Sequence, residues 1–334
     1  MAENNLSTNS DDSIEKRPQF GNRTLGKNAN IFEHNAWDNV TWDEEQEKQA
    51  RDKVAENSTV LTSPEQIAKF ENEADLYWDK FYEIHQNRFF KDRHWLFTEF
   101  PELAPSTVKE DPLQPERVLP NLNQEICNKS SETLSPSGLR ILEIGCGVGN
   151  TVFPILLYNT DPTLFVYCCD FSSNAINILE ENPAYDKSRQ GRYFGKFNHV
   201  NFHLKRLILF IDAKLLCWIM NFYTLFHCYN RMEHVVKQIH RYLKPGGLVL
   251  FRDYGRYDLA QLRFKKGRCL SDNFYARGDG TRVYFFTQDE IRNMFVNNGF
   301  IEEQNILDRR LQVNRGKLIT MYRVWMQAKY RKPL

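Results

Sequence analysis

Short apolar runs that end in glycines or acids recur in the second half of this chain. Residues 140–144 form such a run after the breakers Pro136 and Gly138. A short apolar run bounded by turn residues fits a buried parallel strand better than a helix. Three glycines follow, and the run 152–158 supplies a helix. The pattern is typical of a loop that binds a nucleotide cofactor.

Two further runs extend this pattern. Residues 164–170 are apolar and end in Asp170, about 20 residues after the glycines, where a ribose-hydroxyl acceptor is expected. Residues 242–253 read as a helix end, a Pro-Gly-Gly turn and a buried strand closed by Asp253. Together the three runs predict an α/β fold, a Rossmann-like doubly wound sheet.

Other stretches have helical or strand periodicity. Residues 64–88 predict a helix with Ser63 as N-cap, and Trp78, Phe81 and Tyr82 share one face of it, as core residues would. Residues 287–298 predict an amphipathic helix ended by a glycine, and residues 301–308 and 318–328 predict a final strand pair.

The glycine loop excludes one class of cofactor. A dinucleotide fingerprint needs G-x-G-x-x-G, but Asn150 stands at its third glycine, so the fit to a nicotinamide enzyme is poor. The order E-x-G-x-G-x-G, with Glu143, Gly145, Gly147 and Gly149, is the first motif of class I S-adenosylmethionine methyltransferases. There Glu143 can meet the ammonium group of the methionine moiety.

Composition sets the domain organisation and the compartment. The 334 residues, 41% hydrophobic and 26% charged, allow one large domain or two modest ones. We expect a disordered tail over 1–30, an N-terminal helical extension and linker over 31–135, and the methyltransferase domain over 136–334. Seven cysteines without a C-x-x-C pair indicate reduced thiols and no metal site. No membrane span or targeting peptide is expected, so the location is cytoplasmic.

Charge is distributed unevenly along the chain. Residues 1–135 carry 15 basic and 26 acidic residues, a net of −11, whereas residues 252–334 carry 17 and 9, a net of +8. This asymmetry indicates an anionic partner for the C-terminal half, and ordinary solvated faces of different sign are the alternative.

The C-terminal region interleaves aromatic and basic residues. Rings that stack on bases beside cations that pair with phosphates suggest an RNA surface, and half-buried sheet residues are the alternative. The rings are Phe274, Tyr275, Tyr284, Phe285 and Phe286, and the candidate RNA-binding cations are Arg263, Lys265, Lys266, Arg277, Arg282, Arg309, Arg310, Arg315 and Lys317. The last four are expected between the two final strands.

Several long strings resemble the methyltransferase-like 2 family of tRNA 3-methylcytidine methyltransferases. They cover residues 32–40, 90–100, 141–156, 168–172, 252–267 and 273–286. The resemblance implies transfer of a methyl group from S-adenosylmethionine to N3 of a cytidine at the start of the tRNA anticodon loop, in threonine and some arginine tRNAs. It also implies that Trp78 and Tyr82 touch the cofactor as a lid, and an accessory protein that helps to select the tRNA is a further expected partner.

The chemistry of N3 methylation sets modest demands on the protein. N3 of neutral cytosine carries a lone pair, so no strong base is needed, but methylation makes the ring a cation. A carboxylate near the ring would stabilise that charge. Asp253 is the candidate catalytic residue, and a structural role for it at the following turn is the alternative.

Residues 190–231 depart from the family. They hold ten aromatic residues, six Lys or Arg and one acid, Asp212, without the family's third- and fourth-strand motifs. The resemblance ends abruptly near Arg189 and near Met232. An abrupt end of this kind is typical of a mispredicted exon or a retained intron, whereas point substitutions would make it fade gradually. The alternative to the active enzyme is therefore a catalytically impaired isoform or misannotated gene product that still binds tRNA or a partner. A methyltransferase acting on protein or small molecules is a third interpretation.

Overall fold

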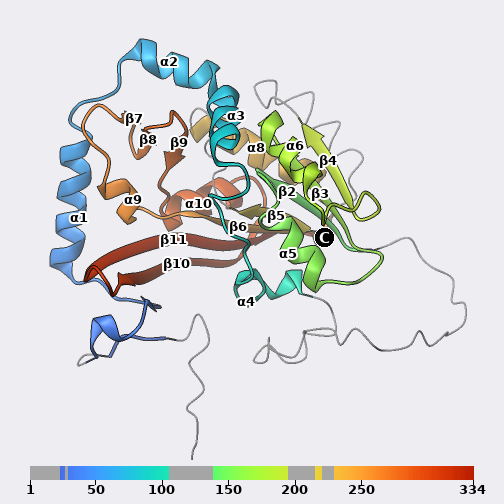
Figure 1. Cartoon of the computed structure of the whole chain (residues 1–334), viewed down its shortest axis with the longest axis horizontal. Helices are drawn as coiled ribbons and strands as arrows, with labels where there is room; N and C mark the ends of the chain where they lie inside the picture. Colours follow the sequence, from blue (N-terminus) through green and yellow to red (C-terminus); the bar gives the residue numbers. More distant parts are fainter. Residues whose placement is uncertain (1–22, 27–28, 105–137, 195–214, 220–228) are drawn as a thin grey trace, which may run out of the picture.

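The computed structural model describes residues 23–26, 29–104, 138–194, 215–219 and 229–334. Its centre is one large mixed sheet of strand order β1-β10-β11-β6-β5-β2-β3-β4 (Figure 1). A small second sheet, β7-β8-β9, lies beside α1 and α9. The predicted α/β methyltransferase-like sheet is confirmed.

Five neighbouring strands form the parallel half of the sheet. They are β6 (Leu248–Tyr254), β5 (Leu215–Ile219), β2 (Arg140–Ile144), β3 (Phe165–Asp170) and β4 (Gln190–Phe194). The order reverses beside β2, so the carboxyl ends of β2 and its neighbours frame a switch-point crevice. The apolar runs of 140–144, 164–170 and 242–253 therefore become strands as the periodicity predicts.

Strands β4 and β5 fall within the divergent segment 190–231. They occupy both places that the family motifs would fill, so the sheet runs without a break from β6 to β4. Residues 229–231 begin α8, and the rest of the segment, 195–214 with Asp212 and 220–228, lies outside the described residues. The same holds for residues 1–22 of the predicted tail, whereas Thr24 forms a bridge to Asp38.

The antiparallel half of the sheet is a long hairpin with a short edge strand. Strand β11 (Ile319–Arg331) pairs with β6, β10 (Ile301–Asn314) pairs with β11, and β1 (Ala36–Trp37) pairs with β10. The final strand pair is confirmed, but β10 is longer than predicted. Arg309 and Arg310 therefore lie inside a strand instead of in the turn, because β10 pairs with β11 as far as Asn314.

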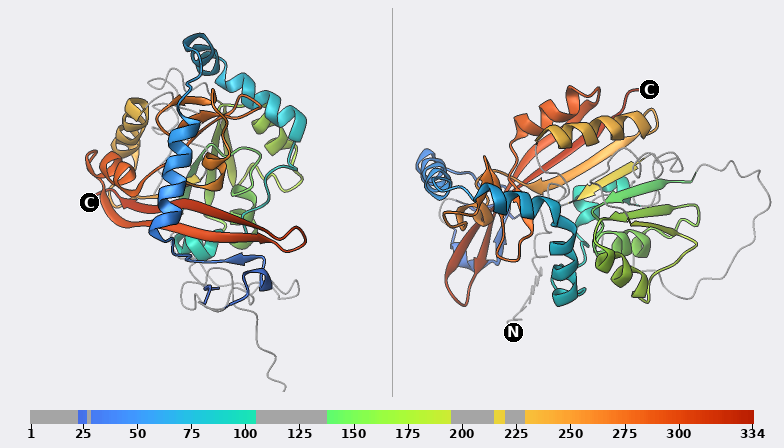
Figure 2. Two further views of the ribbon diagram at one scale, coloured as in Figure 1. Left: turned by 90° about the vertical axis from the view of Figure 1, so that its left-hand side faces the viewer. Right: turned by 90° about the horizontal axis from the view of Figure 1, so that it is seen from above.

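Helices cover both faces of the sheet. On one face lie α8 (Tyr229–Tyr242) and α10 (Gln288–Val296), and on the other lie α4 (Leu96–Glu99), α5 (Val152–Tyr158) and α6 (Ser173–Glu181) (Figure 2). Thr287 caps α10 by a capping box, which explains why the helix begins there. In the described part of the chain, none of the helices has the length and apolar character needed to span a bilayer.

The N-terminal extension packs around the edge of this core. The predicted helix 64–88 is two helices, α2 (Pro64–Asn72) and α3 (Ala74–His85), and Ser63 caps the first as expected. The other elements outside the main layers are η1 (Ile31–Glu33), α1 (Glu44–Asn57), η2 (Pro101–Leu103), α9 (Leu259–Leu262), β7 (Cys269–Ser271), β8 (Phe274–Ala276) and β9 (Arg282–Tyr284).

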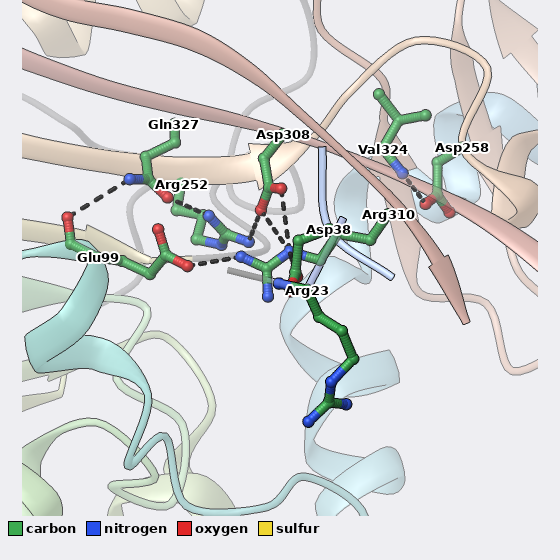
Figure 3. A network of polar contacts seen from close by, with 9 residues as sticks. All are labelled: Arg23, Asp38, Glu99, Arg252, Asp258, Asp308, Arg310, Val324 and Gln327. Carbon is green, nitrogen blue, oxygen red and sulfur yellow. Dashed lines mark hydrogen bonds and ion pairs between the residues drawn. The ribbon is translucent and has the colours of Figure 1, made fainter. Parts of the chain in front are cut away.

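A buried network of charges ties the extension to the C-terminal hairpin (Figure 3). Asp308 accepts hydrogen bonds from Arg252 at 2.6 Å and from Arg310 at 2.9 Å. Arg310 also donates to Glu99 at 2.5 Å and lies 3.6 Å from Asp38. Two guanidinium groups thus share one carboxylate, and residues of the extension supply the balancing negative charge.

Other acids of the extension pair with bases of the hairpin. Glu47 accepts a hydrogen bond from Arg309 at 2.7 Å, and Glu102 accepts one from Lys329 at 2.6 Å. Part of the charge asymmetry between the two ends of the chain is therefore neutralised inside the molecule.

We expect replacement of Arg310 by Ala to destabilise the fold by about 3 to 5 kcal/mol, because it leaves buried carboxylates without their cation. Arg315, exposed in the β10–β11 turn, is the matched control, and Arg315→Ala should change the free energy of unfolding by about 0.5 kcal/mol or less. Urea unfolding of both variants measures the difference. Equal stability of the two variants would show that the network contributes nothing to the fold.

Candidate functional site

The glycine loop joins β2 to α5 at the switch point. Gly145 and Gly147 have φ of 73° and 55°, a region that strongly favours glycine. A Cβ on Gly147 would lie 2.5 Å from the hydroxyl oxygen of Tyr82. Glycine is therefore favoured at Gly145 and Gly147 by the backbone conformation, and at Gly147 also by the close approach of Tyr82 from α3.

Asp170 ends β3 and faces this loop. It accepts hydrogen bonds from the backbone N–H groups of Gly147 at 2.8 Å and Ser172 at 2.9 Å. Burial raises the pKa of Asp170 to about 6, and these hydrogen bonds oppose the rise. The acid predicted to hold a ribose thus already orients the loop beside it.

Glu143 lies in β2, fully buried. Its carboxylate oxygens have weak partners: Arg93 Nη1 forms an ion pair with Oε1 at 3.8 Å, and the Thr151 hydroxyl lies close enough to act on the carboxyl group. Burial raises the pKa of Glu143 to about 8, and Arg93 and Thr151 oppose the rise. A carboxyl group that is buried so deeply and held so loosely is suited to a ligand that brings its own positive charge.

Helix α3 covers the loop. Trp78 and Tyr82 are buried in the core cluster that also contains Ile144 and Val148, which confirms the core interpretation. Their contact with the cofactor as a lid stays a prediction. Trp78 Nε1 is buried without an acceptor among the described residues. Asp79 fastens the helix by accepting hydrogen bonds from the Ser172 hydroxyl at 2.6 Å and the Asn174 N–H at 3.0 Å, at the beginning of α6.

Residues 90–95 approach the loop from the other side. Asn150 donates to the Phe90 carbonyl at 3.2 Å, and its own carbonyl accepts from the Arg93 N–H at 2.9 Å. Arg93 Nη1 also donates to Thr151 Oγ1 at 2.5 Å. Residue-by-residue reasoning assigned no role to Asp79 or Arg93, although Arg93 lies in the string 90–100 that carries the family resemblance and Asp79 directly follows Trp78.

Asp253 is buried at the end of β6. Its Oδ1 accepts the backbone N–H of Tyr254 at 2.8 Å, as the structural alternative requires. Alternation along β6 places Val249, Phe251 and Asp253 on one face and Arg252 on the other. A catalytic role for Asp253 stays a prediction.

The candidate RNA surface is only partly exposed. The five rings between residues 274 and 286 are buried, so the half-buried sheet interpretation is correct for them. Arg282 and Arg310 are buried as well, the first over the ring of Phe274 and the second in the charge network. Their pattern misled because both stand on strands that pack against the core.

The remaining cations divide by their partners. Arg277 donates to Thr281, and Arg309 pairs with Glu47 and lies over the Trp42 ring. The exposed cations are Arg263, Lys265 and Lys266 after α9, and Arg315 and Lys317 in the β10–β11 turn. Both α9 and this turn lie on the side of the molecule where α1 runs (Figures 1 and 2).

The chain is similar in sequence to known methyltransferases. The profile of a family described as "Methyltransferase domain" matches residues 117–303. The tRNA N(3)-cytidine methyltransferase METTL2 of Danio rerio is 51% identical over 329 residues, covering 96% of this chain and 91% of the relative. The tRNA N(3)-methylcytidine methyltransferase trm140 of Schizosaccharomyces pombe is 39% identical over 326 residues, covering 94% and 92%.

Among solved structures, a SAM-dependent methyltransferase of Anabaena variabilis is 12% identical and covers 83% of this chain and 98% of its own, with a TM-score of 0.49. The sheet, the glycine loop and the family match define a class I methyltransferase domain, whose methyl donor is S-adenosylmethionine. The chain belongs to the METTL2 family.

The raised pKa of Glu143 has a consequence for stability. The native state holds this proton up to a pH of about 8, whereas an ordinary Glu loses it near 4.5. The unfolded chain therefore binds fewer protons in this window, and the free energy of unfolding falls as the pH rises.

Glu143→Gln removes this titration. We therefore expect the free energy of unfolding of the variant to fall less steeply with pH than that of the wild type, by up to about 1.4 kcal/mol per pH unit. The window from about pH 6 to 8 isolates Glu143, because the pKa of Asp170, the other raised carboxyl at the loop, is about 6. Urea unfolding of wild type and variant at three pH values across the window tests the prediction. Parallel pH profiles would mean that Glu143 is already ionised in the native state.

Proposed function

We propose that this chain transfers the methyl group of S-adenosylmethionine to N3 of a cytidine in tRNA. The observation that carries the proposal is the combination of the glycine loop, with Glu143 and Asp170 beside it, and long sequence identity to tRNA N(3)-cytidine methyltransferases. The finer substrate, the start of the anticodon loop in threonine and some arginine tRNAs, follows from the family resemblance and is part of the proposal.

The residues around the loop fit the parts of the cofactor. The methionine moiety is a zwitterion, and the buried Glu143 carboxyl and the Arg93 guanidinium, 3.8 Å apart, offer one group for each of its charges. Asp170 would hold the ribose hydroxyls, and Trp78 Nε1 and Tyr82 would close the site from α3. The cofactor supplies the methyl group, and the protein supplies binding and alignment.

The acceptor needs little further catalysis. Cytosine N3 has a lone pair, so holding it in line with the sulfonium methyl is the main requirement. Asp253 is the proposed carboxylate that would stabilise the cationic ring. Asp253→Asn should then lower the methylation rate without changing cofactor affinity.

The competing function is an impaired protein that binds but does not methylate. It rests on the divergence of residues 190–231, which replace both family motifs. The continuous sheet through β5 and β4 favours the active enzyme, because the crevice keeps its neighbouring strands.

A direct assay tests the proposed activity. We expect the full chain to form 3-methylcytidine on unmodified threonine tRNA with labelled S-adenosylmethionine. Arg93→Met, which keeps the side chain's length and removes its charge, should weaken cofactor binding by about 1.5 to 3 kcal/mol in calorimetry. Arg88→Met is the control, because Arg88 is exposed and lies five residues before Arg93 in the chain. Tight cofactor binding without product would identify the impaired protein.

The tRNA is proposed to contact the exposed cations after α9 and in the β10–β11 turn. The double variant Lys265→Ser with Lys266→Ser should flatten the log-log salt dependence of tRNA affinity by about 0.7 to 0.9 for each phosphate that the protein no longer neutralises. The exposed Lys187 and Lys237, replaced in the same way, are the control pair. If the salt dependence of tRNA affinity changed for the Lys187 and Lys237 variant and not for the Lys265 and Lys266 variant, the tRNA would bind on another face.

A further inference from the structure

A pocket of about 240 Å³ lies between residues 90–95 and the strands β1, β6, β10 and β11. Its walls include the rings of Phe90, Trp95 and Trp325 and the side chains of Arg93, Arg252 and Arg310. Sites for drug-sized ligands usually measure about 300 to 1,000 Å³, so this pocket suits a smaller planar group. Aromatic rings beside guanidinium planes are the partners on which an unstacked nucleobase packs.

The cationic wall of the pocket is held rigidly. The Arg252 guanidinium lies 4.9 Å from the ring centre of Trp95 and 5.5 Å from that of Trp325. Its donors reach Asp308 at 2.6 Å and the Gln327 side-chain oxygen (Figure 3). Asp308 and Glu99 lie beside Arg252 and Arg310 and offset part of the positive charge of this wall, while Arg252 can donate to a carbonyl oxygen of a base.

The pocket shares residues with the cofactor crevice. Phe90 and Arg93 line it, and the same two residues hydrogen-bond to Asn150 at the end of the glycine loop. Arg93 also faces Glu143, the group proposed to meet the methionine moiety. The transferable methyl group is bonded to the sulfur of the methionine moiety, so a cofactor held by Glu143 and Arg93 would carry it at the end nearer to this pocket.

We infer that this pocket receives the target cytosine, with Trp95, Trp325 and Arg252 forming the wall against which the base packs. The inference rests on the proposed function, since it takes tRNA cytidine as the acceptor. This location lies on the face of β6 opposite to Asp253, so it makes Arg252 and Trp325 the acceptor-positioning residues in place of Asp253. Asp253→Asn distinguishes the two placements, because it should leave the methylation rate unchanged when the base lies in this pocket.

Removal of one ring tests the pocket. Trp325→Leu should lower the single-turnover rate of 3-methylcytidine formation about tenfold to a hundredfold, the range expected for loss of one base-stacking ring. Cofactor affinity should change less than about twofold, because Trp325 is not proposed to touch the cofactor. Trp42→Leu is the matched control, because that ring packs on Arg309 and Tyr322 outside the pocket.

A crosslink on the wild-type protein avoids any folding defect of the variant. A tRNA with 5-iodocytidine at the methylated position is irradiated in complex with the protein and S-adenosylhomocysteine, and the linked peptide is sequenced. We expect attachment at Phe90, Trp95 or Trp325. Attachment confined to other peptides would overturn the inference.

The results separate the two proposals. A wild-type protein that binds cofactor and forms no 3-methylcytidine would overturn the proposed function, and the pocket assignment with it. An active wild type whose Trp325→Leu and Trp42→Leu variants methylate equally fast would overturn the pocket assignment alone.

Discussion

The buried carboxylate of Asp308, shared by Arg252 and Arg310, is the interaction on which the arrangement of this molecule depends. Burying two guanidinium groups beside a single carboxylate is costly unless further negative charge comes close. Glu99 and Asp38 provide that charge, and both come from the N-terminal extension. The extension and the C-terminal hairpin therefore stabilise each other, and the extension contributes a strand to the hairpin's edge through β1.

This mutual support brings the two sides of the crevice together. Residues 90–95 lie between the charge network and the glycine loop, with Trp95 beside Arg252 and Arg93 beside Glu143. On the opposite side, Asp79 fastens α3 to α6 over Gly147. Phe90 and Arg93 line the pocket and also contact the glycine loop. Cofactor binding and acceptor placement can therefore be coupled through this segment of the extension.

Charge in this protein has two separate uses. The buried Arg310 and the half-buried Arg309 of β10 neutralise acids of the extension, whereas cations in turns stay exposed to solvent. A buried ion pair fixes geometry and is poorly available to a nucleic acid, while an exposed cation exchanges its counterions for phosphates at little cost. Net charge along the chain therefore overstates the basic surface that a tRNA meets.

The sequence by itself determined the local features of the fold. Apolar runs bounded by breakers predicted β2, β3 and β6, the glycines predicted the loop, and Ser63 and Thr287 marked helix starts, because each depends on neighbours within a few residues. Only the tertiary structure decided which charged and aromatic side chains are buried. Arg282, Arg310 and the rings of β8 and β9 look like an RNA surface in sequence, but the hydrophobic clusters and the charge network enclose them. The approach of Arg93 to Glu143 was likewise decided by the tertiary structure. The two residues are 50 positions apart, and no local sequence pattern shows that the extension packs against β2.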